Sequence, residues 1–166
     1  MQKAVYLLSL VFNTMCWAQD SSFLAVVRVD YSSTSGKEDT QFSLDKERHI
    51  FFIESDNKEE LLFYNAFLKE NEESHSAGTI KSVKRIKNTK AQQVYSFEWN
   101  FENSYDAIKG KVFVTLVIDE SETTNKESKA KITITNEKDL QLVYEGSITY
   151  MIKPIVFYYR LEKIKD

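Results

Sequence analysis

The side chains that most often carry catalysis are scarce in this sequence. His49 and His75 are its two histidines and Cys16 is its one cysteine, so no site with several thiolates can form. No Gly-x-Ser-x-Gly turn presents a serine, and the four glycines form no phosphate-binding loop. The 25 acidic residues offer too many accidental carboxylate pairs for one pair to indicate a glycosidase. The sequence therefore predicts no catalytic residue, no metal ligand and no cofactor.

Both histidines are interpreted as structural. His49 stands beside apolar residues in a predicted strand, so we expect it to pack within the sheet or at its edge. His75 lies in a polar segment, which we interpret as a loop with a solvated imidazole. A Ser-His-Asp triad assembled from distant positions stays an open alternative, but no local motif supports it.

Aromatic side chains are the groups best suited to binding. Residues 94–101 read VYSFEWNF, and strand side chains alternate between two faces, so four aromatic rings share one face. Flat apolar walls with polar Tyr and Trp tips suit a lipid, haem or glycan. The hypothesis of a ligand site names Tyr95, Phe97, Trp99, Tyr144 and Tyr150. The alternative is that this stripe only fills a solid core.

Residues 79–90 form a basic segment with two interpretations. Lys84, Arg85 and Lys87 lie within it and form a candidate interaction patch. The other interpretation is an exposed edge strand, because lysines on an edge discourage pairing with other molecules. Without Lys3 of the leader, 21 basic residues stand against 25 acidic ones, a net charge of −4. An acidic domain is a poor partner for nucleic acid.

Period-two alternation predicts most of the elements that must position these groups. It predicts strands at 23–31, 41–45, 49–54, 94–101, 108–119, 129–135, 140–151 and 155–161, with a long polar loop at 121–128. Gly110 falls inside one strand and indicates a bulge or a close approach. Strands of about ten residues with short connections favour antiparallel neighbours.

One helix is expected, at about residues 57–70. Asp56 and Glu59 have the spacing of a capping box, and the apolar residues that follow cover a broad helical arc. A buried strand is the rival interpretation of LLFYNAFL. The fold class is thus mainly β, an antiparallel up-and-down meander that is barrel-like or strongly curved, with one helix packed on or across it. The meander resembles a lipocalin-like barrel, a likeness of fold that assigns no function. A transmembrane barrel is a further alternative, which the expected helix and the charged tail disfavour.

The first 18 residues are expected to be a cleaved signal peptide. Lys3 precedes an apolar run that is too short to span a bilayer, and Ala18 ends a site that signal peptidase accepts. Cys16 lacks the neighbours of a lipobox, so simple export is preferred to lipidation. Residues 19–166 then form one β-rich domain without cysteine, which suits a bacterial periplasm, cell surface or secreted protein.

These observations favour an exported, non-enzymatic binding domain that holds an apolar or amphipathic small molecule. The alternative is a structural or protein-interaction domain of the envelope with a solid core, and an enzyme of unrecognised class is third. The expected partners are an apolar small molecule or an envelope protein, with no nucleic acid and no integral membrane segment.

Overall fold

The computed structural model describes residues 23–38, 47–55, 60–69, 72–124 and 127–164. The predicted leader and the predicted strand at 41–45 lie outside these residues. The elements are β1 (Phe23–Thr34), β2 (Lys37–Glu38), β3 (Glu47–Ser55), β4 (Leu61–Lys69), β5 (Glu72–Asn88), β6 (Gln92–Asn103), β7 (Lys109–Thr124), β8 (Glu127–Thr135), β9 (Gln141–Tyr150) and α3 (Pro154–Glu162).

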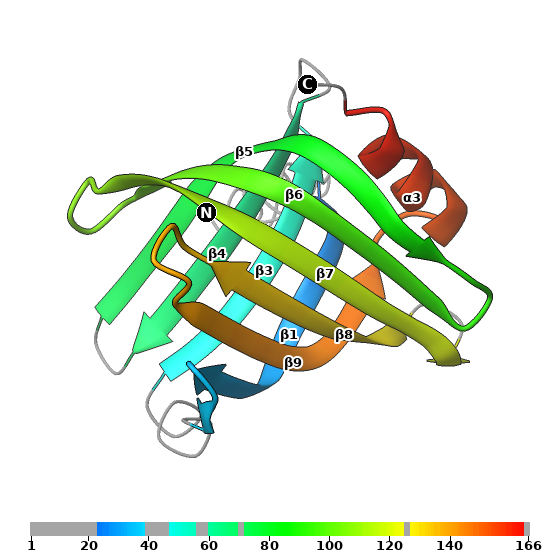
Figure 1. The fold of residues 1–166 in the computed structure, drawn as a ribbon, viewed down its shortest axis with the longest axis horizontal. Helices are drawn as coiled ribbons and strands as arrows, with labels where there is room; N and C mark the ends of the chain where they lie inside the picture. Colours follow the sequence, from blue (N-terminus) through cyan, green and yellow to red (C-terminus); the bar gives the residue numbers. More distant parts are fainter. Residues whose placement is uncertain (1–22, 39–46, 56–59, 70–71, 125–126, 165–166) are drawn as a thin grey trace, which may run out of the picture.

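These strands form one antiparallel sheet that closes on itself (Figure 1). Neighbours follow chain order from β3 to β9, and β1 pairs with both β3 and β9. The short β2 only folds back on the end of β1. The predicted meander is therefore a closed eight-stranded barrel, in which the part of β5 after Thr79 pairs with β6 alone.

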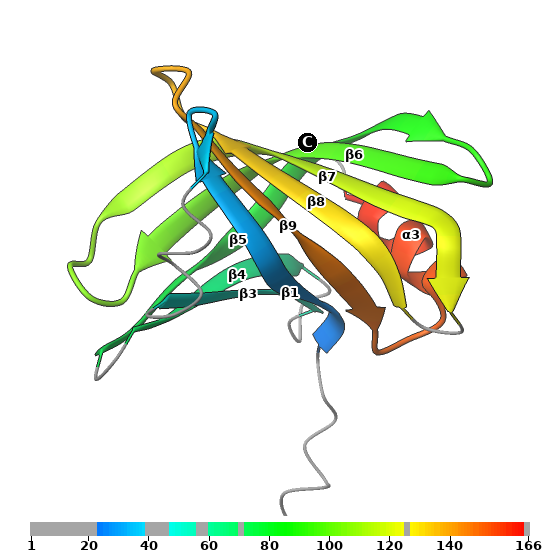
Figure 2. The ribbon, with the colours of Figure 1, turned by 90° about the horizontal axis from the view of Figure 1, so that it is seen from below.

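The two ends of the barrel differ. The helix α3 lies across one end, beside the β5–β6 turn, whereas the turns β6–β7 and β8–β9 project at the opposite end (Figures 1 and 2). Phe157 and Leu161 of α3 are completely buried, so the helix plugs its end with apolar side chains. We call the opposite end the mouth.

Strict alternation places the aromatic stripe inside the barrel. Tyr95, Phe97 and Trp99 on β6 are buried, and their intervening neighbours are only half-buried. The same pattern on β7, β8 and β9 turns Val114, Leu116, Ile132, Ile148 and Tyr150 inward. The predicted faces of these strands are confirmed.

Close backbone contact fixes the seam between β1 and β9. A bulge between Val29 and Tyr31 shifts the register there, and Gly146 lies opposite Val29. A Cβ at Gly146 would lie 1.8 Å from the carbonyl oxygen of Arg28. The barrel therefore closes only with glycine at this position.

The helix predicted at about residues 57–70 is wrong in position. Residues 61–69 are strand β4, which pairs with β3 along nine residues and with β5 along eight. Leu61 and Phe63 are buried while Leu62 and Tyr64 are half-buried, the alternation of a strand. A run that is apolar on both faces fits either template, and pairing with two neighbours decides for the strand. Residues 56–59 of the supposed cap lie outside the described residues.

The strand predicted at 155–161 is also wrong, because this segment is α3. Pro154 stands in its first turn, where the missing N–H and fixed φ of proline are tolerated. The predicted loop at 121–128 is shorter than expected, since β7 reaches Thr124 and β8 begins at Glu127. His75 lies in β5 rather than in a loop, although its side chain is exposed as expected.

Candidate functional site

An open cavity of about 650 Å³ lies at the mouth of the barrel. This size is within the range of small-molecule sites. The side chains around it come from β4 to β9 and from the β8–β9 turn. They are Asn65, Ser76, Trp99, Phe101, Gly110, Lys111, Val112, Ile134, Asn136, Glu137, Lys138, Leu140, Leu142 and Tyr144.

The cavity has one polar side and one apolar side. Asn65 of β4 and Ser76 of β5 supply an amide and a hydroxyl, whereas Val112, Ile134 and Leu142 of β7 to β9 supply aliphatic groups. The charged residues Lys111, Glu137 and Lys138 are exposed, so they stand at the rim. The arrangement can hold an amphipathic molecule in a fixed orientation.

Trp99 stands where the cavity meets the core. Its side chain is 3% exposed, and its ring lies 5.1 Å from that of Phe63 and 4.9 Å from that of Phe101. Its Nε1 is a buried donor without a hydrogen-bond partner among the described residues. An unpaired buried donor costs about 1 to 3 kcal/mol of stability. Tight packing of the ring therefore does not by itself explain why a tryptophan occupies this position.

Asn65, His49 and Tyr144 form the polar corner of the mouth. The Nδ1 of His49 lies 3.4 Å from the amide of Asn65, and its ring lies 4.9 Å from that of Tyr144. His49 is thus a packed histidine inside the sheet, one of the two positions expected for it. The side chain of Ser76 accepts a hydrogen bond from Asn103 at 3.0 Å, which leaves the serine hydroxyl proton to donate elsewhere.

A layer of packed aromatic rings separates the cavity from the plugged end. Phe63 lies 5.4 Å from Phe51 and 5.4 Å from Phe97, and Phe51 lies 5.0 Å from Tyr144. Phe51, Phe63 and Phe97 are buried almost completely. The barrel interior is therefore open at the mouth and filled with side chains beyond this layer.

The five residues predicted as a ligand site are divided by depth. Trp99 and Tyr144 line the cavity, and Phe97 lies in the aromatic layer beneath it. Tyr95 and Tyr150 lie at the plugged end, where Tyr95 stacks on Tyr158 at 5.8 Å and Tyr150 contacts Phe157 at 5.4 Å. The structure thus brings together two of the five at the cavity.

A carboxylate and three hydroxyl groups form a polar cluster under α3. Glu120 accepts hydrogen bonds from Ser128 at 3.1 Å, from Tyr150 at 3.1 Å and from Tyr158. The Tyr150 and Tyr158 hydroxyls lie 2.5 Å apart. Burial is the main cause that raises the pKa of Tyr158 and of Tyr150 above the usual tyrosine value, and Glu120 adds to both shifts. These contacts join β7, β8 and β9 to the helix.

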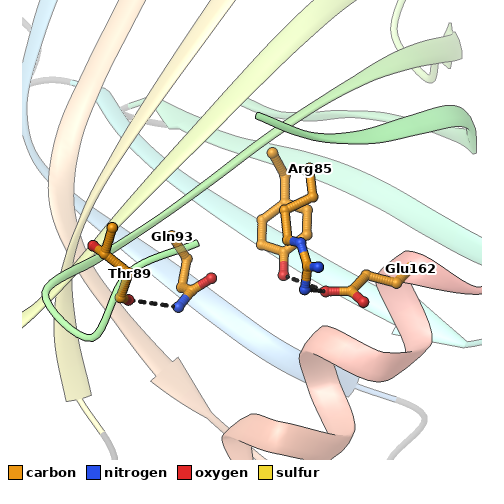
Figure 3. A network of polar contacts seen from close by, with 5 residues as sticks. Arg85, Thr89, Gln93 and Glu162 are labelled. Carbon is orange, nitrogen blue, oxygen red and sulfur yellow. Dashed lines mark hydrogen bonds and ion pairs between the residues drawn. The ribbon is translucent and has the colours of Figure 1, made fainter. Parts of the chain in front are cut away.

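A second polar contact anchors the far end of α3 (Figure 3). Arg85 of β5 forms an ion pair with Glu162 at 2.6 Å, and the same carboxylate accepts a hydrogen bond from Tyr95 at 3.1 Å. Burial, followed by the bond to Glu162, raises the pKa of Tyr95. In the adjoining β5–β6 turn, Gln93 donates to the carbonyl of Thr89 at 2.9 Å.

The basic patch of the sequence lies on the exposed part of β5. From Ile80 onward this strand pairs with β6 only, because its pairing with β4 ends at Thr79. Arg85 is held by Glu162, and Lys87 donates to Gln92 at 2.9 Å. Lys84 is exposed on the same strand. The role of Lys84, Arg85 and Lys87 in binding a partner stays a prediction.

The ligand site predicted from the sequence does not include Asn65, Ser76 or Phe101, although all three line the mouth. Asn65 falls within the helix expected at about residues 57–70, and Ser76 adjoins His75 in the expected loop. Phe101 was placed on the inner face but not in the site. Side chains two residues apart on a strand point to the same face, so Asn65 points inward with buried Phe63 once residues 61–69 are interpreted as a strand.

Comparison with protein-family models, with curated proteins and with solved structures found no match. Within the described part of the chain no helix is long and apolar enough to cross a membrane. The same residues contain no cluster of three or more His, Cys, Asp or Glu side chains that could hold a metal ion. The candidate function therefore depends on the geometry of the mouth.

Proposed function

We propose that this chain is an exported, non-enzymatic binding protein that holds an apolar or amphipathic small molecule in the mouth half of its barrel. The observation that carries the proposal is the cavity of about 650 Å³ beside a buried tryptophan whose indole N–H is unpaired among the described residues. An open cavity of this size, lined by aromatic and aliphatic side chains inside a barrel end, is typical of a small-molecule site.

The cavity lining supports binding rather than chemistry. Its inward groups are aromatic rings, aliphatic side chains, amides and a hydroxyl, which orient a ligand without reacting with it. The layer of Phe51, Phe63 and Phe97 supplies a rigid floor. A preformed, rigid site reduces the entropy cost of binding.

Ligand titration tests the proposal in a full chain that carries Trp17→Phe, so that Trp99 is its one tryptophan. We expect retinol, 1-dodecanol or 2-acetylnaphthalene to change the Trp99 emission and raise the melting temperature. A ligand present at 100 times its Kd stabilises the folded state by about 2.7 kcal/mol.

Two valine variants on one strand supply the matched control. Val112→Phe fills the cavity and should abolish these responses, whereas Val117→Phe, on the outer face of β7, should leave them unchanged. Circular dichroism checks that both variants fold. If no compound shifts the melting temperature of the parent protein, the proposal fails and the protein-interaction alternative takes its place.

A further inference from the structure

The unused hydrogen-bonding groups of the mouth limit which ligand head group can bind there. Asn65 lies on the cavity wall. Within the described residues, the only hydrogen-bonding partner of its side chain is His49, at the long distance of 3.4 Å. An amide has two donor hydrogens and an acceptor oxygen, so most of its hydrogen-bonding capacity is unused there. Ser76, next to it on β5, has a hydroxyl proton to donate.

Resting on the proposed function, we propose that the ligand carries an uncharged polar head, a carbonyl, hydroxyl or amide, that binds Asn65 on the β4 side of the cavity. Its apolar body lies along Val112, Ile134 and Leu142 on the opposite side. The indole N–H of Trp99 is unpaired among the described residues but covered by neighbouring atoms, so a ligand would reach it only if the adjacent rings moved.

The distribution of charge disfavours a carboxylate head at this depth. Lys111 lies at the rim, and its Nζ is 3.2 Å from the carboxylate of Glu98. Glu137 and Lys138 are exposed on the β8–β9 turn and carry opposite charges. A carboxylate beside Asn65 and Trp99 would lose its hydration, and the cavity lining holds no lysine or arginine at that depth to compensate, which is unfavourable. Neutral groups pay a much smaller desolvation penalty.

The test compares three probes with one aromatic body. They are 2-acetylnaphthalene, which has a neutral acceptor, 2-ethylnaphthalene, which has none, and 2-naphthoate, which is charged. We expect the ketone to bind the full-length protein about tenfold more tightly than the hydrocarbon, the difference that one good hydrogen bond makes. The carboxylate should bind at least about tenfold more weakly than the ketone. Calorimetry measures all three affinities.

Two matched variants assign the preference to the β4 side. Asn65→Leu should lower the ratio of ketone to hydrocarbon affinity to about one while leaving hydrocarbon affinity within about twofold. Asn100→Leu makes the same change on the outer face of β6, between Trp99 and Phe101 in sequence, and should leave the ratio unchanged. Thermal melts check that both variants fold.

The outcomes separate this inference from the proposed function. Equal affinity for ketone and hydrocarbon, or tightest binding of the carboxylate, overturns the uncharged head but leaves a binding cavity. A preference that persists in Asn65→Leu overturns the assignment to Asn65. If none of the three probes binds, the inference falls, and the titrations with retinol and 1-dodecanol decide the proposed function separately.

Discussion

The ring of Phe101 occupies the space where a side chain of residue 110 would lie. The two residues are cross-strand partners on β6 and β7, and a Cβ built on Gly110 would lie 2.7 Å from the Cζ of Phe101. Phe101 can therefore lie flat over the glycine at the edge of the cavity. The close approach predicted at Gly110 is confirmed, and it links strand geometry to the shape of the mouth.

The first prediction follows from this contact. Gly110→Ala forces the Phe101 ring toward the cavity, so we expect a loss of about 1 to 3 kcal/mol of stability and weaker ligand binding. Denaturant unfolding measures the stability. In a Phe101→Leu background the alanine should cost much less, because the shorter side chain leaves room. An equal loss of stability in both backgrounds would show that the alanine methyl group does not clash with the Phe101 ring.

The sequence alone predicts the strands whose apolar residues alternate with polar ones. In β6 and β8 the alternation of Trp99 with Glu98, or of Ile132 with Lys131, fits a strand and no helix. In β4 and α3 apolar residues occupy both faces, so a single segment satisfies both templates. Whether such a segment becomes a helix or a strand depends on which other elements cover its two faces. That depends on the fold of the whole chain and not on the local pattern.

The candidate site is predicted less well because alternation gives the face of a side chain but not its depth in the barrel. Trp99 and Tyr95 share a face of β6, yet one lines the cavity and the other supports α3. The polar partner Asn65 comes from a segment that was interpreted as a helix. Depth depends on which end of the barrel α3 plugs, and no local pattern records this.

The second prediction concerns Trp99 as a core residue. Trp99→Ala should lower the free energy of unfolding by about 3 to 5 kcal/mol, since the ring is buried against Phe63 and Phe101. Phe113→Ala is the control, because that ring is 49% exposed on the outer face of β7 and should cost no more than about 0.5 kcal/mol. Urea unfolding of both variants checks the difference, and similar small shifts would mean that Trp99 is not part of the core.

The third prediction is that apolar burial, rather than the ion pair, holds α3 on the barrel. Leu161 is fully buried, so Leu161→Ala should cost about 2 to 5 kcal/mol. Arg85 and Glu162 are 42% and 34% exposed, so solvent screens their ion pair and Arg85→Met should cost no more than about 1 kcal/mol. Thermal unfolding at low and high salt compares the two variants. A larger loss for Arg85→Met, abolished by salt, would reverse this ranking.

The fourth prediction is a loss of stability in alkali. Burial raises the pKa values of Tyr95, Tyr150 and Tyr158 above the usual value of about 10, with Glu162 or Glu120 adding to each shift. A tyrosine whose pKa is higher in the folded state stabilises that state. This stabilisation is complete below the pKa of the unfolded state, and it is lost as pH rises through the pKa of the folded state. The free energy of unfolding should therefore fall steadily above about pH 10, where the unfolded chain releases these protons and the folded chain retains them.

Ultraviolet absorbance of tyrosinate measures this prediction directly when circular dichroism is followed in the same titration. Some of the nine tyrosines should ionise only together with loss of the β signal. Tyr158→Phe keeps the ring beside Phe157 but removes one buried hydroxyl that donates to Glu120, so its stability should fall less steeply with pH above 10. Tyrosine ionisation that is complete while the barrel is still folded would contradict the burial of these hydroxyls.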